Sequence, residues 1–432
     1  MVRELCGVAL TEGKINMRET PAFVPADILL PQGVEMEKWS TIACDQFSSE
    51  PAYWAQVEKF VGDAPSTLRM MLPEAWLEGA DLSAWGAKIA GTMSGYQAGG
   101  VLKPLENSFI YIERTLTSGR VRRGLVGALD LEAYEYTKGT KATVRASENT
   151  VIDRLPPRIA MRKAAPLELP HIMVLIDDPD KGVIEPLSQA CDRLETVYDF
   201  DLMEGGGHIR GHRVSGVAAC DVQAQLQMLA LKTRAKYGDR GALMIIGDGN
   251  HSLAAAKSCW NEIKSGLSDE ERKNHPARFA LVELTNLHDP SLEIEPIHRI
   301  VFGQSADLPE KFVQACPHAE FGAGTGYHIG FLSKEEEGSI TVSGLTIGQT
   351  IGALQEFLDA YVQENGGSID YIHGDDSVRQ LAGAEDCVGF FMPAVEKGDL
   401  FPSVIEGGVF PQKSFSMGHA RDKRYYLEAR AI

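Results

Sequence analysis

The sequence predicts an α/β fold (α+β with a mixed sheet), and two observations support this prediction. Apolar segments with the length of buried strands interleave with longer helix-like segments through most of the 432 residues. Two strand-like segments, 109–115 and 124–131, follow each other directly, as in an antiparallel meander. We divide the chain into an N-terminal wrapping and helical region (1–105), a mixed-sheet core (106–305) and a C-terminal α/β region (306–432).

The elements of the N-terminal region follow from local patterns. Residues 22–31 combine prolines with short apolar pieces, which predicts extended chain wrapped on a core. Residues 50–60 predict a helix, because Pro51 suits a first helical position. Residues 82–98 predict a second helix.

Further along the chain, apolar runs alternate with helical segments. The predicted strands of the core are 109–115, 124–131, 171–176, 242–246 and 277–284, and its predicted helices are 184–198, 221–236 and the segment after residue 252. The C-terminal region is predicted to hold a helix at 350–363 and strands at 368–372 and 387–391.

Composition limits the class of protein. A net charge of −18 argues against a nucleic-acid surface, because such surfaces need clustered Lys and Arg. No apolar run approaches the length of a membrane span, and no secretory signal is evident. Seven scattered cysteines without a CxxC pair favour reduced thiols in the cytoplasm. We therefore expect a cytoplasmic protein with a small-molecule partner; whether it forms a homodimer is left open.

The turn Gly-Asp-Gly-Asn-His-Ser at 247–252 is the strongest functional signal. It joins a buried strand to an alanine-rich helix. Gly247 and Gly249 permit a tight turn that a ligand can approach closely, and Asn250 or Ser252 can cap the helix. The N–H groups and dipole at a helix start favour an anion such as phosphate.

Two side chains of this turn add chemistry. Asp248 offers a hard oxygen to a divalent ion, and His251 offers a proton donor or a phosphate contact. The glycine spacing matches neither the dinucleotide-binding fingerprint nor the P-loop. An ordinary strand-to-helix turn with solvated polar residues remains the alternative interpretation.

The segment 144–162 is unusually rich in charge. Its arginines, among them Arg145 and Arg154, can hold phosphate or carboxylate through paired hydrogen bonds. Glu148 and Asp153 can serve as a base or as a metal ligand. The alternative is a solvated loop with internal ion pairs.

Three further segments contain candidate ligand-binding residues. Residues 205–212 place two histidines four apart, but four glycines favour a hairpin over a zinc-binding helix. His298 and Arg299, on a predicted strand, face either the same cleft as His251 or the interior. Residues 413–426 are basic within an acidic chain, so Lys413 and Lys423 suit a phosphate site or neutralise the acidic body.

These motifs together resemble domain-of-unknown-function family 1015, in its long form. The resemblance rests on segments spread over nearly the whole chain: 43–54, 145–148 with 153–158, 167–172, 247–252, 295–299, and 414–418 with 423–426. The turn at Asp248 is similar to that of ParB/sulfiredoxin-type folds, which include nucleotide-dependent kinases of free serine. Asn250 and Ser252 depart from the usual DGHHR-like pattern of that turn.

The resemblance implies a large core related to the ParB/sulfiredoxin-like fold and phosphoryl transfer on serine, phosphoserine or a similar hydroxy amino acid. Mg²⁺ and ATP or ADP are then expected as cofactors. Asp248, as metal ligand, His251 and Glu148 are expected to be catalytic, and the expected binding residues are Gly247, Gly249, Asn250, Ser252, Arg145, Arg154, His298, Arg299, Lys413 and Lys423. A non-catalytic sensor of a nucleotide or amino acid, or a small-molecule phosphatase, are the alternatives.

Overall fold

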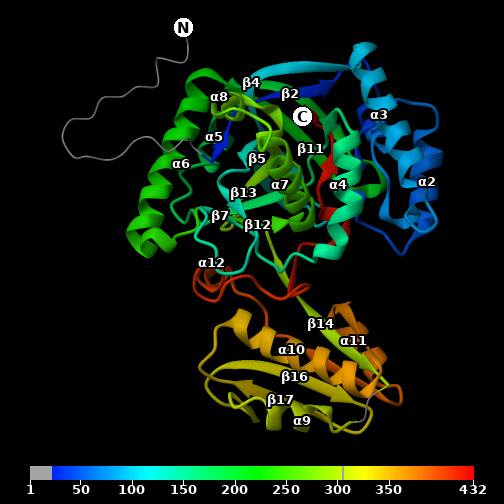
Figure 1. Cartoon of the computed structure of the whole chain (residues 1–432), viewed down its shortest axis with the longest axis vertical. Helices are drawn as coiled ribbons and strands as arrows, with labels where there is room; N and C mark the ends of the chain where they lie inside the picture. Colours follow the sequence, from blue (N-terminus) through cyan, green and yellow to red (C-terminus); the bar gives the residue numbers. More distant parts are fainter. Residues whose placement is uncertain (1–21, 304–305) are drawn as a thin grey trace.

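The computed structural model describes residues 22–303 and 306–432. Figure 1 shows two units, a larger one above and a smaller one below, with strand β14 (Ile294–Phe302) running from one to the other. The C-terminal segment returns to the larger unit, where β21 (Tyr425–Tyr426) pairs with β3 (Thr41–Ile42) and β22 (Arg430–Ala431) pairs with β8 (Leu167–Glu168).

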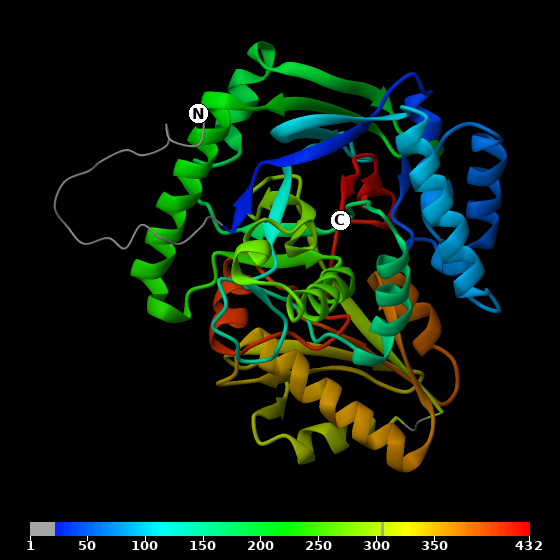
Figure 2. The same cartoon turned by 45° about the horizontal axis from the view of Figure 1, so that its top comes forward.

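The larger unit is organised by an 11-stranded sheet in the order β10-β11-β4-β5-β13-β9-β12-β7-β6, with β1 added to β5 and β2 to β4. Figure 2 shows β2, in blue, lying along β4, in cyan. The strands are β1 (Phe23–Val24), β2 (Ala26–Pro31), β4 (Leu102–Thr115), β5 (Val121–Asp130), β6 (Tyr134–Glu135), β7 (Val144–Arg145), β9 (Met173–Ile176), β10 (Glu195–Asp201), β11 (His208–Val214), β12 (Met244–Asp248) and β13 (Phe279–Asn286).

Both strand directions occur in this sheet, which confirms the predicted mixed α/β class. β4, β5 and β13 form antiparallel neighbours. β13 runs parallel to β9, and β12 runs parallel to β7 but antiparallel to β9. The central strands β9 and β12 consist of buried apolar residues at most positions, as expected for strands covered on both faces.

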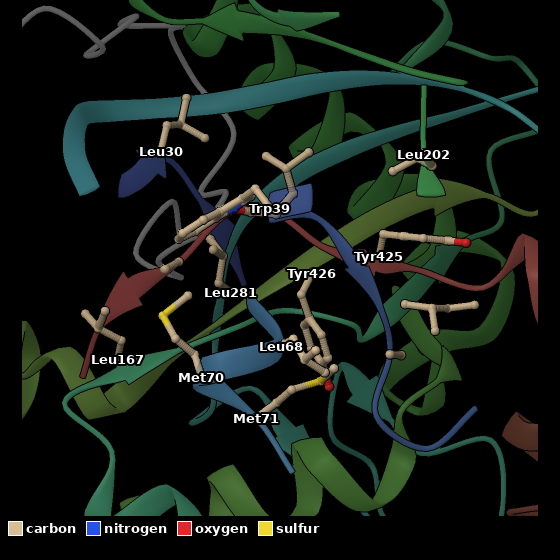
Figure 3. Packing of buried hydrophobic residues seen from close by; sticks show 14 of the residues in the cluster. Leu30, Trp39, Leu68, Met70, Met71, Leu167, Leu202, Leu281, Tyr425 and Tyr426 are labelled. Atoms are coloured by element: carbon tan, nitrogen blue, oxygen red, sulfur yellow. The ribbon is translucent and has the colours of Figure 1, made fainter. Parts of the chain in front are cut away.

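Helices cover this sheet and enclose its cores. They are α1 (Met36–Trp39), α2 (Pro51–Val61), α3 (Leu82–Ala98), α4 (Leu155–Ala164), α5 (Glu185–Ala190), α6 (Gly216–Tyr237), α7 (Asn250–Lys264) and α8 (Asp269–Asn274). One core cluster lies between the sheet and the N-terminal helices, where Trp39, Met70 and Tyr426 are buried together (Figure 3). Packing of C-terminal Tyr426 against N-terminal residues ties the two ends of the chain together.

The smaller unit holds a 7-stranded sheet in the order β15-β17-β16-β19-β14-β18, with β20 added to β14. Its remaining strands are β15 (Ala319–Phe321), β16 (Tyr327–Ser333), β17 (Glu337–Val342), β18 (Ser368–His373), β19 (Cys387–Phe391) and β20 (Phe415–Met417). Its helices are α9 (Leu308–Ala315), α10 (Ile347–Asn365), α11 (Asp375–Ala382) and α12 (Lys397–Glu406). Within the described ranges, no helix has both the length and the apolar character that crossing a bilayer requires.

Several sequence predictions differ from this fold. The predicted boundary at residue 105 falls inside β4, because β2 and β4 are neighbours in one sheet. The predicted helix 184–198 is wrong beyond Ala190, since residues 195–201 form strand β10. β10 pairs with β11, which confirms the predicted hairpin around 205–212. The first part of the predicted N-terminal wrapping region lies outside the described residues.

Candidate functional site

Three neighbouring strand ends bring polar side chains to one edge of the larger sheet. β12 ends at Asp248, and its parallel neighbour β7 is paired so that Ile245 lies beside Arg145. Glu148 and Asp248 each follow this pair by three residues, and the charge of Asp248 acts on Glu148. On the other side, β9 begins just after His171. We call Glu148, Asp248, His171 and Lys423 the strand-end site; ligands of open α/β sheets commonly bind where parallel strands end.

Helix α7 starts directly above these strand ends. Its N-cap is Gly249, which has φ 81° and no side chain that caps the first turn. A Cβ at this position would lie 3.0 Å from Ile172. Asn250 and Ser252, predicted as caps, instead lie within the helix. The uncapped start of α7 therefore presents N–H groups and a positive dipole end to the strand-end site.

Asn250 fixes the chain that carries Glu148. Its Oδ1 accepts a hydrogen bond from the Ser147 N–H at 3.2 Å, and its Nδ2 donates to Ser147 Oγ at 3.2 Å. His251 acts on the same segment, because its Nε2 accepts the N–H of Val151 at 3.2 Å. The first turn of α7 thus positions the backbone around Glu148 from two sides.

Glu148 lies half-buried, and among the described residues its hydrogen-bond donors are backbone N–H groups. Its Oε1 accepts the N–H of Ser414 at 3.1 Å. Burial raises the pKa of Glu148 to about 7, and the negative charge of Asp248 adds to the increase, against the lowering effect of the backbone N–H groups of Ser414 and Lys413. A carboxyl group with this pKa exchanges protons readily near neutral pH, as a general base requires.

Asp248 remains ionised beside Glu148 because a lysine accompanies it. Lys423 Nζ lies 3.1 Å from Asp248 Oδ2, and the Gly249 N–H donates to Oδ1 at 2.9 Å. Burial acts to raise the pKa of Asp248, but the charge and hydrogen bond of Lys423, the charge of His171 and the Gly249 N–H together hold that pKa below its usual value. The Asp248 side chain is 27% exposed, so a ligand can reach the carboxylate.

His171 belongs to the strand-end site by its position and was not among the residues predicted from the sequence. One ring nitrogen bonds Ser252 Oγ at 3.1 Å, and the other bonds the Tyr426 hydroxyl at 3.0 Å. Its charge also acts to lower the pKa of Asp248. The signal was present in the segment 167–172, which contributed to the family resemblance but received no chemical role.

Two predicted binding residues are not brought to the strand-end site. The guanidinium of Arg145 donates to the backbone oxygens of Ala142 and Arg240, at 2.8 and 2.6 Å, so it braces a loop. His298 uses both ring nitrogens inside the smaller unit, on Asp375 and the Met392 N–H. The side chain of Arg154 lies outside the described residues.

Arg299 and Lys413 reach the edge of the site. Arg299 is buried, donates to Gln355 Oε1 at 3.0 Å and to the Lys413 carbonyl at 3.1 Å, and feels the charge of Glu148. Lys413 has φ 58° and an exposed side chain whose charge acts on Glu148. Arg299 therefore holds the Lys413 turn in place.

A second acidic group lies nearby. Glu293, Glu295 and His419 place their ligand atoms within 4.8 Å of one another, and they are the one group of this kind found among the described residues. Glu293 is also paired with Arg120, and the side chains of Glu293 and His419 are 47% and 66% exposed. These features fit a solvated surface cluster.

Comparison with known proteins agrees with the sequence motifs. The model of family DUF1015, described as a protein of unknown function, matches residues 29–365. No curated protein matches the chain.

Among solved structures, a free serine kinase in complex with AMP is similar at 10% identity and a TM-score of 0.37, over 68% of this chain and 93% of the other. SbnI from Staphylococcus aureus, with its C-terminus truncated, has 10% identity and a TM-score of 0.37 over 68% and 82%. A conserved hypothetical protein from Pyrococcus furiosus has 11% identity and a TM-score of 0.35 over 69% and 95%. The family model covers most of the chain, and the protein therefore belongs to the DUF1015 family.

Proposed function

We propose that this protein is a phosphotransferase that moves a phosphoryl group between a nucleotide, ATP or ADP, and the hydroxyl of serine or a similar small hydroxy amino acid. One observation carries the proposal. Glu148, with a pKa of about 7, stands beside the ionised pair of Asp248 and Lys423 at the uncapped start of α7. Phosphoryl transfer depends on such positioning and charge neutralisation.

Each group has a distinct task in the proposed reaction. The ionised form of Glu148 accepts the proton of the substrate hydroxyl as its oxygen bonds to the terminal phosphorus. The bond between that phosphorus and the bridging oxygen breaks, and the shortened nucleotide leaves with the electron pair. Lys423 and the N–H groups of α7 stabilise the charge on the phosphoryl oxygens. His251 is proposed to contact the transferred group, and Lys413 to extend the positive lining.

The donor set suits Mg²⁺. The carboxylate of Asp248 is ionised, partly exposed and placed next to the proposed phosphate position, and Mg²⁺ prefers carboxylate and phosphate oxygens. Asp248 would therefore hold the ion, which when bound neutralises charge on the phosphate oxygens. Lys423 competes for the same carboxylate, so the affinity for Mg²⁺ is expected to be higher with nucleotide present.

The test is phosphorus NMR of the purified protein with Mg²⁺ and four pairings, of ATP or ADP with serine or phosphoserine. We expect transfer in at least one pairing. Glu148→Gln and Asp248→Asn should reduce the rate by about 100-fold or more, since losing a general base or an electrostatic contact costs that much. Glu293→Gln is the control, because it lies in the separate acidic group and should keep the parent rate.

The other outcomes separate the alternatives. Phosphate release from phosphoserine without a nucleotide would identify a phosphatase instead. Nucleotide binding without turnover in any pairing would identify a non-catalytic sensor. An active parent whose rate survives both Glu148→Gln and Asp248→Asn would show that the chemistry occurs elsewhere.

A further inference from the structure

A cavity of about 210 Å³ lies between the N-terminal helical segments, α4 and the first turns of α7. Met70 and Met71 come from the segment after α2, Met93 from α3 and Met161 from α4. The cavity is smaller than the ~300 Å³ at the low end of sites for drug-sized ligands, so it accommodates one compact ring system.

This cavity adjoins the strand-end site through His171. Both His171 and Ser252 line it, and the hydrogen bond between them joins the cavity wall to the first turn of α7. The charge of His171 also acts on Asp248. In the sheet order β9-β12-β7, His171 and Glu148 flank Asp248 on opposite sides. The cavity therefore lies on the His171 side of Asp248, away from the proposed base.

The cavity walls select the chemistry of an occupant. Four methionine side chains supply polarisable thioethers, which contact aromatic rings favourably. Figure 3 shows Met71 and Tyr426 pointing toward the same place, and both line the cavity. Burial raises the pKa of Cys44, also in the wall, to about 12, so its thiol is uncharged. At the rim, Arg158 is neutralised by Glu74. An uncharged, flat, aromatic group fits these walls better than an ion.

We propose that the methionine-lined cavity binds the heterocyclic base of the nucleotide, with its phosphates directed past His171 and Ser252 to the start of α7. This inference rests on the proposed function and deepens it, because it places the two substrates on opposite sides of Asp248. The nucleotide occupies the His171 side of Asp248, and the hydroxy amino acid occupies the Glu148 side. A base held here leaves its phosphates at the helix dipole.

The experiment labels the methionine methyl groups of the full chain with ¹³C and titrates AMP, then inorganic pyrophosphate. AMP should shift the signals of Met70, Met71, Met93 and Met161 through the ring current of the base, whereas pyrophosphate should leave them nearly unchanged. Met161→Trp, which fills the cavity from α4, should weaken AMP binding at least tenfold and change pyrophosphate binding less than twofold. Ala160→Trp adds the same ring on the exposed face of α4 and should change neither.

The outcomes test the assignment of the cavity separately from the proposed phosphotransferase function. AMP binding that leaves the four methionine signals unmoved, or that survives Met161→Trp unchanged, would overturn the assignment of the cavity even if phosphoryl transfer is observed. Methionine shifts with AMP but no transfer in any pairing would support the cavity and contradict the proposed function. If Met161→Trp unfolds the protein, Met161→Leu removes the thioether at similar volume, and the loss of one shifted signal still tests the site.

Discussion

Two glutamates of the larger unit, Glu283 and Glu148, have pKa values that are shifted in opposite directions. Glu283, on β13, is ion-paired with Arg424 at 2.5 Å, and Arg424 also holds Glu428 at 2.5 Å. Burial acts to raise the pKa of Glu283, but Arg424 and then Arg122 hold it below the usual value. At the strand-end site, backbone N–H groups donate to Glu148, and burial raises its pKa to about 7.

The difference distinguishes a charge that is ion-paired to hold the fold together from a charge that is available to exchange a proton. The Glu283 network (Glu283, Arg122, Arg424, Glu428 and Tyr198) is almost fully buried, with Arg424 and Glu283 only 3% and 2% exposed, and Tyr198 donates to Glu428 at 2.6 Å. Such a network fixes how the C-terminal segment docks on the sheet. The strand-end site keeps an acid whose charge is incompletely compensated, which costs stability but provides a group that can accept a proton.

The largest expected effect comes from Glu283→Gln. This change leaves the guanidinium groups of Arg122 and Arg424 buried beside a neutral amide, so the free energy of unfolding should fall by about 3–5 kcal/mol. Glu148→Gln, the matched change at the strand-end site, should lower the free energy of unfolding only slightly, because burial already disfavours the charged form of Glu148. Chemical denaturation of the two variants measures both. Equal losses of stability would contradict the distinction between the two groups.

The second prediction concerns the sign of the pH dependence. The pKa of Glu148 is raised from 4.5 to about 7, so its contribution to stability is complete below the lower value and disappears as the pH rises through the upper one. The parent should lose up to about 3 kcal/mol relative to Glu148→Gln between about pH 5 and pH 8. The pKa of Glu283 is lowered, so its contribution is present above 4.5 and is lost as the pH falls. Denaturation from about pH 8 down to about pH 3, below the ordinary glutamate pKa, checks both signs, and a parent curve parallel to that of Glu148→Gln would refute the first.

The strand-end site was predictable from the sequence where the signal is local. A buried strand, two glycines and an alanine-rich helix specify the turn around Asp248 by themselves, and the mixed α/β class follows from interleaved patterns. Lys423 was found because a basic segment stands out in an acidic chain. Glu148 was found through its charged segment, although its position beside Asp248 depends on the pairing of β7 with β12, which no local pattern encodes.

The predictions that failed also depend on contacts between residues that are far apart in the sequence. His171 precedes a strand that shows no polar pattern, and its role depends on Ser252 and Tyr426, far away in the sequence. Arg145 carries the charge expected of a phosphate ligand, but folding directs it to two carbonyl groups. The predicted helix 184–198 extends too far, because residues 195–201 pair with β11 and form a strand.

A smaller effect is expected where the site depends on backbone shape. Gly249→Ala adds a Cβ 3.0 Å from Ile172 at a residue with φ 81°, so it should cost about 1–3 kcal/mol and displace the start of α7. Gly91→Ala is the control. Gly91 lies in the middle of α3 with nothing within 4 Å of a new Cβ, and alanine there should stabilise the protein by about 0.5–1 kcal/mol. Thermal unfolding distinguishes these signs, and a neutral Gly249→Ala would mean that the turn tolerates other shapes.

The smallest expected effect tests how Asp248 keeps its charge. Lys423→Met removes the ammonium group 3.1 Å from Asp248 while keeping the length of the side chain. Burial then acts on Asp248 with less opposition, so its pKa should rise. Carboxyl ¹³C titration of Asp248 in parent and variant measures the shift, with the exposed pair of Lys232 and Asp180 as an internal reference. An unchanged pKa would show that the N–H groups at the start of α7 hold the charge without the lysine, and the role of Lys423 would then be limited to the ligand.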